Sequence, residues 1–379
     1  MRLFENLNID FMRKRNFFYL ISSVVIILGA LSIIFRGLQF GIDFKGGSEI
    51  AIEFSNPIEI GQIRTEVENI GLGNVEVKTF GGSTGILLRT ELQEIPQSIL
   101  PKVKSKIETI ISNSFPGVEK KIIDSTFNSI TYSFANDSIS LAVSERLNKA
   151  GFQTTELNEE ETKNAIVVRL GISDWIKETL TEKFANNPFT VLKEEKVGPK
   201  IGQELKRDAV IAVFLSLIVI LIYLGFRFKF IFAVGAVAAL FHDVLITLGI
   251  FSVLYGVIPG FNLEITTSVV AAFLTLVGYS INDTVVVFDR VREYLKIHKT
   301  LPLEETMNRA INKTMSRTII TGLTTLLTVI VLMIFGGEVL KGFAFALFIG
   351  ILTGTYSSIF VASAFVLEVA SRTNRKVQF

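Results

Sequence analysis

The stretch Leu-Val-Gly-Tyr-Ser-Ile-Asn-Asp-Thr-Val-Val-Val-Phe-Asp-Arg-Val-Arg (residues 276–292) places Asn282 and Asp283 inside an apolar run of membrane-spanning length. Asp283 precedes Arg290, at the charged end of the run, by roughly 10 Å of helical rise, so its carboxylate lies at hydrocarbon depth. An ionised Asp in lipid costs roughly 2.5 to 3.5 kcal/mol, which favours burial among helices. The stretch therefore predicts a helix bundle around an intramembrane acid. Asp283 is a candidate functional residue; the alternative is an interhelical hydrogen bond without a role in transport.

The composition is typical of a polytopic membrane protein. Hydrophobic residues make up 49% of the 379 residues, the mean hydropathy is +0.48, and the apolar residues come in blocks of about twenty. The first block is too long for a signal-peptide core and lacks a small-residue cleavage site, so we expect it to be retained. Six transmembrane helices are predicted, at residues 17–35, 209–226, 230–255, 265–288, 318–335 and 342–367.

The charge and cysteine content exclude several classes of function. A net charge of +2 gives no argument for a nucleic-acid partner. The chain has no cysteine, so disulfides, thiolate catalysis and cysteine metal sites are excluded, and two widely separated histidines do not favour zinc. We therefore expect no cofactor and no metal.

The distribution of basic residues predicts the topology. The segments between the spans that would be cytoplasmic are rich in Lys and Arg, whereas the two short outer loops hold only Lys341. The positive-inside rule then places both termini in the cytoplasm. The basic residues assigned to the cytoplasm are Arg13, Lys14, Arg15, Arg227, Lys229, Arg290, Arg292, Lys296, Lys299, Arg309, Lys313, Arg317, Arg372, Arg375 and Lys376.

A soluble segment of roughly 170 residues separates the first and second spans, and its pattern repeats. Each half is predicted to have βαββαβ order, which matches a ferredoxin-like layout of helices on one face of an antiparallel sheet, with the junction near residues 125–128. The alternative is one larger α+β domain. The predicted division is residues 1–35 (N-terminus and first span), 36–126 and 127–207 (two periplasmic ferredoxin-like units) and 208–379 (the remaining spans).

Further polar residues occur within the apolar blocks. Asp243, beside His242, is a second acid near mid-membrane, although His242 alone is more typical of a hydrogen-bonded packing residue. Threonines at residues 318, 321, 325 and 328 follow Arg317 as a stripe, which indicates either back-bonding to the helix or a hydrated path. Small residues recur every four positions through residues 342–362 and predict a close-packing face. Residues 289–317 predict an amphipathic surface helix before the fifth span.

Four motifs resemble those of the SecD/SecF family of protein-export membrane proteins, related to resistance-nodulation-division (RND) transporters, and within it the SecF type. They are Phe-Gly-Ile-Asp-Phe-Lys-Gly-Gly (40–47), Val-Gly-Pro-Lys-Ile-Gly-Gln-Glu-Leu (197–205), Phe-His-Asp-Val-Leu-Ile-Thr-Leu-Gly (241–249) and Gly-Tyr-Ser-Ile-Asn-Asp-Thr-Val-Val-Val-Phe-Asp-Arg (278–290). The motif positions taken from the resemblance are Gly41, Asp43, Phe44, Gly46, Gly47, Gly278, Asp289 and Arg290.

The resemblance implies a multi-pass protein of the bacterial inner membrane that pairs with SecD, docks on SecYEG and uses the proton gradient to help pull unfolded exported chains outward. It implies that Asp283 is the proton-path carboxylate, that Arg317 is its cationic partner, and that Asn282 and Thr284 line the same site, to which we add Asp243 and His242 as candidates. The departure is the soluble segment, which has room for two compact units where the family usually has one.

The sequence features are relevant to four classes of function. The motifs favour a non-enzymatic, proton-coupled accessory of protein export. An RND-type exporter of small molecules or lipids would share the buried acids but usually carries two membrane halves in one chain. A passive translocon scaffold would not depend on Asp283. An intramembrane hydrolase is disfavoured because Asp243 and Asp283 lie in no recognised protease motif.

Overall fold

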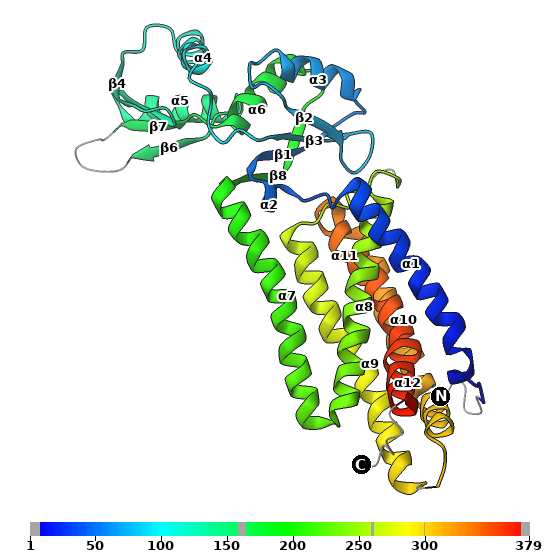
Figure 1. The fold of residues 1–379 in the computed structure, drawn as a ribbon. Coiled ribbons are helices and arrows are strands. Elements are labelled where there is room, and N and C mark those ends of the chain that lie inside the picture. Colours follow the sequence, from blue (N-terminus) through cyan, green and yellow to red (C-terminus); the bar gives the residue numbers. More distant parts are fainter. Residues whose placement is uncertain (1–7, 158–163, 259–260, 299, 373–379) are drawn as a thin grey trace. The chain divides into compact units, whose positions relative to one another are not determined.

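The computed structural model describes residues 8–157, 164–258, 261–298 and 300–372. The chain forms two compact units, of which one comprises Met1–Gly41 and Glu204–Phe379 and the other Ile42–Gln203. The first contains long helices and the second contains two β-sheets (Figure 1). Of the basic residues used to predict topology, Lys299, Arg375 and Lys376 lie outside the described residues.

The helical unit confirms the prediction of six spans. Within the described part of the chain, six helical stretches are long and apolar enough to cross a membrane, so the protein is a multi-pass membrane protein. They are α1 (Arg15–Arg36), which follows the short η1 (Met12–Lys14), then α7 (Pro199–Arg227), α8 (Phe230–Leu254), α9 (Thr267–Ile297), α10 (Leu303–Phe335), and a continuous stretch of α11 (Gly337–Ser357), the π-helical η2 (Ser358–Ser363) and α12 (Ala364–Arg372).

The prediction of a separate amphipathic helix within residues 289–317 is wrong. α9 continues to Ile297 and α10 begins at Leu303, so the same residues form the ends of two spanning helices. The apolar residues that suggested a surface helix, such as Met307, Ala310 and Ile311, are buried in the cluster that also contains Val287 and Phe288 of α9. The amphipathic pattern therefore reflects packing between helices.

Close backbone contact holds the bundle together around α8, the most buried of the spanning helices. α1 crosses α8 where Gly29 meets Gly249, and a Cβ on Gly29 would lie 2.7 Å from the Cα of Gly249. The small-residue face of α11 packs against α9: a Cβ on Gly350 would collide with Leu276, and one on Gly354 would lie 2.9 Å from Ser280. This face is thus used inside the chain.

The soluble unit contains two four-stranded antiparallel sheets. The first has the order β2-β3-β1-β8 and the second has the order β4-β5-β7-β6. The strands are β1 (Gly47–Phe54), β2 (Glu76–Thr79), β3 (Gly85–Thr90), β4 (Lys120–Ser125), β5 (Ser129–Phe134), β6 (Thr154–Leu157), β7 (Ala165–Arg169) and β8 (Phe189–Val197). The helices are α2 (Ile42–Lys45), α3 (Ile60–Glu68), α4 (Leu100–Ser114), α5 (Asp137–Lys149) and α6 (Ile172–Lys183).

The two sheets do not follow the predicted division into residues 36–126 and 127–207. β8, from the second half, pairs with β1, and β4, from the first half, pairs with β5. The helices follow the same pattern, because α6 packs with α3 and α4 packs with α5. The second ferredoxin-like unit is therefore a continuous insertion, residues 91–170, between β3 and α6 of the first.

This nested arrangement keeps the sheet order expected of a ferredoxin-like unit in both cases. In the first unit β8 takes the place of the fourth strand beside β1. In the insertion α4 and β4 precede the other elements, which is the same layout with its last helix and strand moved to the front. We call residues 42–90 and 171–203 the base and residues 91–170 the insert.

Two glycines explain the motif at the start of β1. Gly46 and Gly47 have φ angles of 79° and 124°, which disfavour any side chain. A Cβ on Gly46 would lie 2.9 Å from Pro199, and one on Gly47 would collide with the carbonyl oxygen of Thr90. The paired glycines therefore let the start of β1 pack directly against the backbone of Pro199 and of Thr90 at the end of β3.

Candidate functional site

The polar centre of the helical unit is Asp243 on α8. The residue is 1% exposed, and three side chains contact its carboxylate. Ser280 of α9 and Ser357 of α11 donate to Oδ2 over 2.7 and 2.8 Å, and Nδ1 of His242 lies 3.0 Å from Oδ1. Because a buried carboxyl group needs such partners, these contacts join three spanning helices around one acid.

His242 extends this centre to α1. Its Nε2 lies 2.9 Å from the hydroxyl of Ser22, which lies 2.8 Å from the hydroxyl of Tyr356 on α11. The Tyr356 hydroxyl donates to the main-chain carbonyl of Phe18 over 2.6 Å. The prediction that His242 is a hydrogen-bonded residue is confirmed, and its partners connect Asp243 with α1.

The same face of α9 carries the polar centre toward Asp283. Ser280 and Thr284 are one turn apart, and the Thr284 hydroxyl lies 2.8 Å from that of Ser358 at the start of η2. η2 is π-helical, and at its end the Ser363 hydroxyl donates to the carbonyl of Ser358. Short π segments inside α-helices are frequent at functional sites.

Asp283 lies on this buried face. It is 4% exposed, and in the part of the chain that the structure describes its Oδ2 has no hydrogen-bond partner. The buried hydroxyl of Thr318, on the neighbouring α10, also has no partner there. Burying a carboxylate oxygen without a hydrogen-bond partner costs free energy. Asp283 therefore has fewer of its hydrogen-bonding needs met than Asp243.

Arg317 and Asn282 lie differently from the site residues above. Arg317 is exposed in the single chain, and within the described residues it forms no ion pair with Asp283 at 4.0 Å or less, although its charge acts electrostatically on that carboxyl group. Asn282 is exposed on the opposite side of α9, together with Gly278. The structure thus brings Asp283, Thr284, Asp243 and His242 onto one buried polar layer and leaves Arg317 and Asn282 at its outside.

The remaining motif residues have structural positions. The main-chain NH of Gly41 donates to the carbonyl of Ile265 over 2.8 Å. In α2, Phe44 is buried and Asp43 is half-buried. Asp289 accepts two hydrogen bonds from Arg227. Arg290 pairs with Glu293 at 2.6 Å.

Five of the hydroxyl groups in the polar layer were not predicted. They are those of Ser22, Ser280, Tyr356, Ser357 and Ser358. Each lies in a predicted span, and Ser280 lies inside a quoted motif, but a serine in an apolar helix commonly bonds its own backbone. Only the spatial meeting of four helices distinguishes these hydroxyls from such cases.

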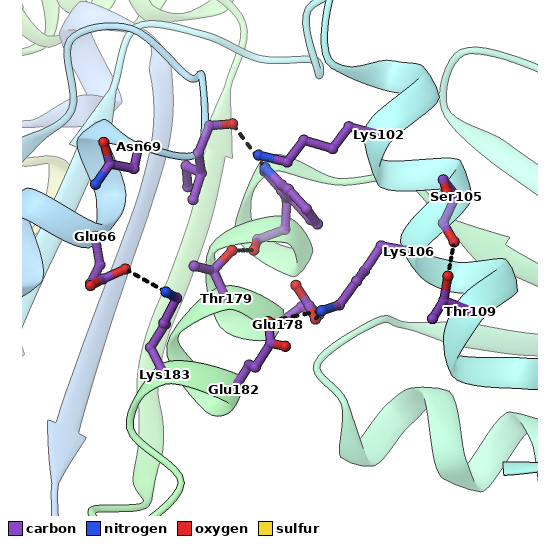
Figure 2. Close-up of a pocket in the computed structure, with 12 residues that line it drawn as sticks. Glu66, Asn69, Lys102, Ser105, Lys106, Thr109, Glu178, Thr179, Glu182 and Lys183 are labelled. Atoms are coloured by element: carbon purple, nitrogen blue, oxygen red, sulfur yellow. Dashed lines mark hydrogen bonds and ion pairs between the residues drawn. The ribbon is translucent and has the colours of Figure 1, made fainter. Parts of the chain in front are cut away.

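A cleft in the soluble unit is the other polar feature of note (Figure 2). It has a volume of about 480 Å³ and lies between α3 and α6 of the base and α4 of the insert. Figure 2 shows Lys106 reaching toward Glu178 and Glu182, with N–O distances of 3.3 and 2.8 Å. The indole NH of Trp175 donates to the carbonyl of Ile70 over 3.2 Å.

Burial and charge oppose each other in this cleft. Burial raises the pKa of Glu178 above its ordinary value, against the opposing effect of Lys106. Burial alone would lower the pKa of Lys106, but the hydrogen bonds and charges of Glu182 and Glu178 raise it. The ion pair therefore links the insert to the base at the cost of a desolvated carboxylate. No group of three His, Cys, Asp or Glu suited to a metal ion occurs among the described residues.

The fold and the polar layer define a class: a polytopic membrane protein with buried acids in a six-helix unit and a large soluble segment after the first helix. Comparison with known proteins specifies the family. The model "Protein export membrane protein SecD/SecF, C-terminal" matches residues 176–372, and the model "SecD/SecF GG Motif" matches residues 31–58. The chain therefore belongs to the SecD/SecF family.

Individual relatives agree with this assignment. The protein translocase subunit SecF of Rhodothermus marinus is 40% identical over 372 residues, which cover 98% of this chain and 96% of that protein. The protein translocase subunit SecDF of Thermus thermophilus is 49% identical over 208 residues, 55% of this chain and 27% of that protein. The crystal structure of Thermus SecDF, a translocon-associated membrane protein, matches with a TM-score of 0.66 at 30% identity over 98% of this chain. This chain spans 39% of that SecDF chain.

Proposed function

We propose that the chain is a SecF-type accessory subunit of the Sec protein translocase, and that it uses the proton gradient to promote late steps of export across the bacterial inner membrane. One observation carries the proton coupling: Asp283 is buried in a spanning helix, and its Oδ2 has no hydrogen-bond partner in the described part of the chain. Such an oxygen can take a proton, which removes a buried charge.

Arg317 is the proposed electrostatic control of Asp283. A guanidinium remains charged at physiological pH, so only the acid can change its protonation state. Movement of Arg317 toward Asp283 stabilises the carboxylate and favours proton release, whereas separation favours uptake. Movement between α9 and α10 would then gate proton passage, and each proton supplies roughly 2.3 kcal/mol per 100 mV of membrane potential.

The partners follow from the family membership. We propose that the chain pairs with SecD, docks on SecYEG and acts on the unfolded exported polypeptide, without catalysing a covalent reaction. The positive-inside distribution supports cytoplasmic termini and a periplasmic soluble unit. Proton flow inward would then drive cycles of movement in the soluble unit that bias an emerging chain outward.

The test measures gradient-dependent protein export in cells whose only copy of this protein carries Asp283→Asn. We expect normal protein levels and normal association with SecD, but loss of the part of export that an ionophore abolishes in the wild type. Asp208→Asn, which neutralises an exposed carboxylate at the start of the second span, is the matched control and should export normally. Full gradient-dependent export in the Asp283→Asn strain would rule out the mechanism and favour a passive scaffold.

A further inference from the structure

The hydrogen-bond chain from Asp243 to α1 ends on a group that can only accept. Four short contacts follow one another: Asp243 Oδ1 to His242 Nδ1 (3.0 Å), His242 Nε2 to Ser22 Oγ (2.9 Å), Ser22 Oγ to the Tyr356 hydroxyl (2.8 Å) and that hydroxyl to Phe18 O (2.6 Å). A main-chain carbonyl has no hydrogen to donate. The direction of the last bond is therefore fixed.

Counting hydrogens along the chain fixes the other directions. Tyr356 has one hydroxyl hydrogen, and Phe18 takes it. Ser22 must then donate its own hydrogen to Tyr356, because two hydroxyl oxygens 2.8 Å apart with no hydrogen between them would repel. Ser22 has nothing left to give to His242, so the imidazole donates from Nε2.

The same count applies to the contact between His242 and Asp243. One hydrogen must lie between Nδ1 and Oδ1, either on an imidazolium or on a protonated carboxyl group. A proton on Oδ2, which faces Ser280 and Ser357, would not lie between Nδ1 and Oδ1 and would leave that contact without a hydrogen. The pair of His242 and Asp243 therefore holds one proton more than a neutral imidazole beside a carboxylate, and it has no net charge.

We propose that Ser22 and Tyr356 are positioning residues that make His242 and Asp243 a proton-holding pair, with the carbonyl of Phe18 as the group that sets its state. Burial supports the same state, because all of Asp243 and nearly all of His242 are enclosed, where a net charge is costly. From the helices packed against the pair, α1 contributes Ser22, α9 contributes Ser280, and α11 contributes Ser357 and Tyr356, so Tyr356 is the titratable group among these partners.

Release of the proton has a structural consequence. Three hydrogens would then remain for four contacts, so one contact must lose its bond. The chain can keep its inner contacts only by reversing: Ser22 donates to Nε2 and Tyr356 donates to Ser22. The bond from Tyr356 to Phe18 is then lost. Proton occupancy at Asp243 is thereby tied to the contact between α11 and α1, which, if the proposed proton coupling holds, makes this pair a second site on the proton path.

Nitrogen-15 NMR of labelled histidine in the full-length protein in lipid tests both ends of the imidazole. The Nε2 signal reports the direction of its hydrogen bond, and the Nδ1 signal reports the proton held with Asp243, because a neutral imidazole can also carry its hydrogen on Nε2. The chain has two histidines, so His298→Gln leaves His242 as the reporter. At neutral pH we expect a protonated Nε2 together with an Nδ1 that shares a hydrogen with Oδ1 of Asp243. A His242 with an unprotonated Nε2 at neutral pH, and unaltered by Tyr356→Phe, would overturn the proposal.

Substitutions separate positioning from folding. Tyr356→Phe removes the link to Phe18 and lets Ser22 donate to Nε2. The ratio of Nε2-protonated to Nε2-unprotonated His242 should therefore fall about fivefold, as the loss of a preference of about 1 kcal/mol gives. Ser22→Ala should also change the Nε2 signal, and Ser22→Thr, which keeps a hydroxyl, should restore it. Tyr279→Phe is the matched control, because the Tyr279 hydroxyl contacts Thr325 and takes no part in the hydrogen-bond chain from Asp243 to Phe18. Equal signals in Tyr356→Phe and Tyr279→Phe would refute the positioning role.

The NMR result is independent of the proposed function. If Asp283→Asn leaves export unchanged while His242 shows the expected Nε2 proton, the proton coupling fails and the proton-holding pair stands. If export depends on Asp283 but His242 lacks that proton, the pair fails and the proposed function stands.

Discussion

At Gly47, in the soluble unit, both the backbone conformation and a close backbone contact oppose a side chain. Its φ angle is 124°, and a Cβ would collide with the carbonyl oxygen of Thr90 in the same sheet. We expect Gly47→Ala to lower the free energy of unfolding of this unit by about 3 kcal/mol or more, from backbone strain plus the collision. Denaturant unfolding of the full-length protein, followed by fluorescence of Trp175, the single tryptophan, measures it.

Gly73→Ala is the control for Gly47→Ala. Gly73 also has a positive φ, 70°, but open space surrounds the position of its Cβ. Only the strain of the left-handed conformation applies there, about 1 kcal/mol. Equal losses in the two variants would show that the contact with Thr90 has no energetic weight.

Glu178 should make the stability of the soluble unit depend on pH. Because burial raises its pKa in the folded state, its contribution to stability is fully present below the pKa of the unfolded chain, near 4.5, and is lost as the pH rises through the raised value. Glu178→Gln removes this titration. The stability of the variant relative to the wild type should therefore increase with pH across that window, as monitored by Trp175.

Asp174 and Glu145 serve as internal references for that experiment. The raised pKa of Asp174 adds the same pH dependence to both proteins and cancels in the difference. Glu145 is exposed, and Lys149 lowers its pKa, so Glu145→Gln should give a change of opposite sign. A difference between wild type and Glu178→Gln that is constant across pH 4 to 7 would contradict the assignment.

Some residues of the site could be predicted from the sequence around them, and others could not. Asp283 and Asp243 were predictable because an acid in an apolar helix is rare and expensive. Ser22, Tyr356 and Ser357 were not, since a single hydroxyl in an apolar helix has no distinguishing pattern. The exposure of Arg317 was also not predictable, because the direction of a side chain on a helix depends on how neighbouring helices pack.

The packing of α11 on α9 gives a prediction at the scale of elements. Gly350 faces Leu276 so closely that a Cβ would collide with its side chain. We expect Gly350→Leu to lower the thermal stability of the chain in detergent, since overpacking costs about 1 to 3 kcal/mol. Gly225→Leu on α7 is the matched control, because nothing lies within 4 Å of its Cβ position. Equal melting temperatures for the two variants would show that α11 and α9 can separate freely.

For the soluble unit, sequence patterns predicted the strands and helices but not how the strands pair. The βαββαβ order of elements in each half of the soluble unit was predicted correctly, because alternation and helical periodicity are local. The nesting of the insert within the base was not, since β4 and β8 satisfy the same pattern in either sheet. Which strand lies beside β1 is decided by contacts more than 100 residues apart, such as Glu49 with Glu195.

At the scale of the whole molecule, the distribution of charge makes a prediction about orientation. Basic residues concentrate around the connections from α7 to α8 and from α9 to α10, mostly in the adjoining ends of these helices. Near the connections from α8 to α9 and from α10 to α11, the sequence has only one basic residue, Lys341, in the first turns of α11. Residues 42–198 lie between the first and second spanning helices in the sequence, so the side of the membrane on which they fall fixes the orientation of all six. The positive-inside rule predicts that they are periplasmic.

Because the chain contains no cysteine, single-cysteine variants report orientation without background. Lys121→Cys lies on an exposed position of β4, and Lys296→Cys lies on an exposed position near the end of α9. A membrane-impermeant maleimide applied to cells with a permeabilised outer membrane should label Lys121→Cys. Lys296→Cys should react only after the inner membrane is opened, which also proves that its thiol is accessible. Labelling of Lys296→Cys in intact inner membranes, with Lys121→Cys protected, would reverse the orientation and with it the direction in which a proton entering from outside would meet Asp283.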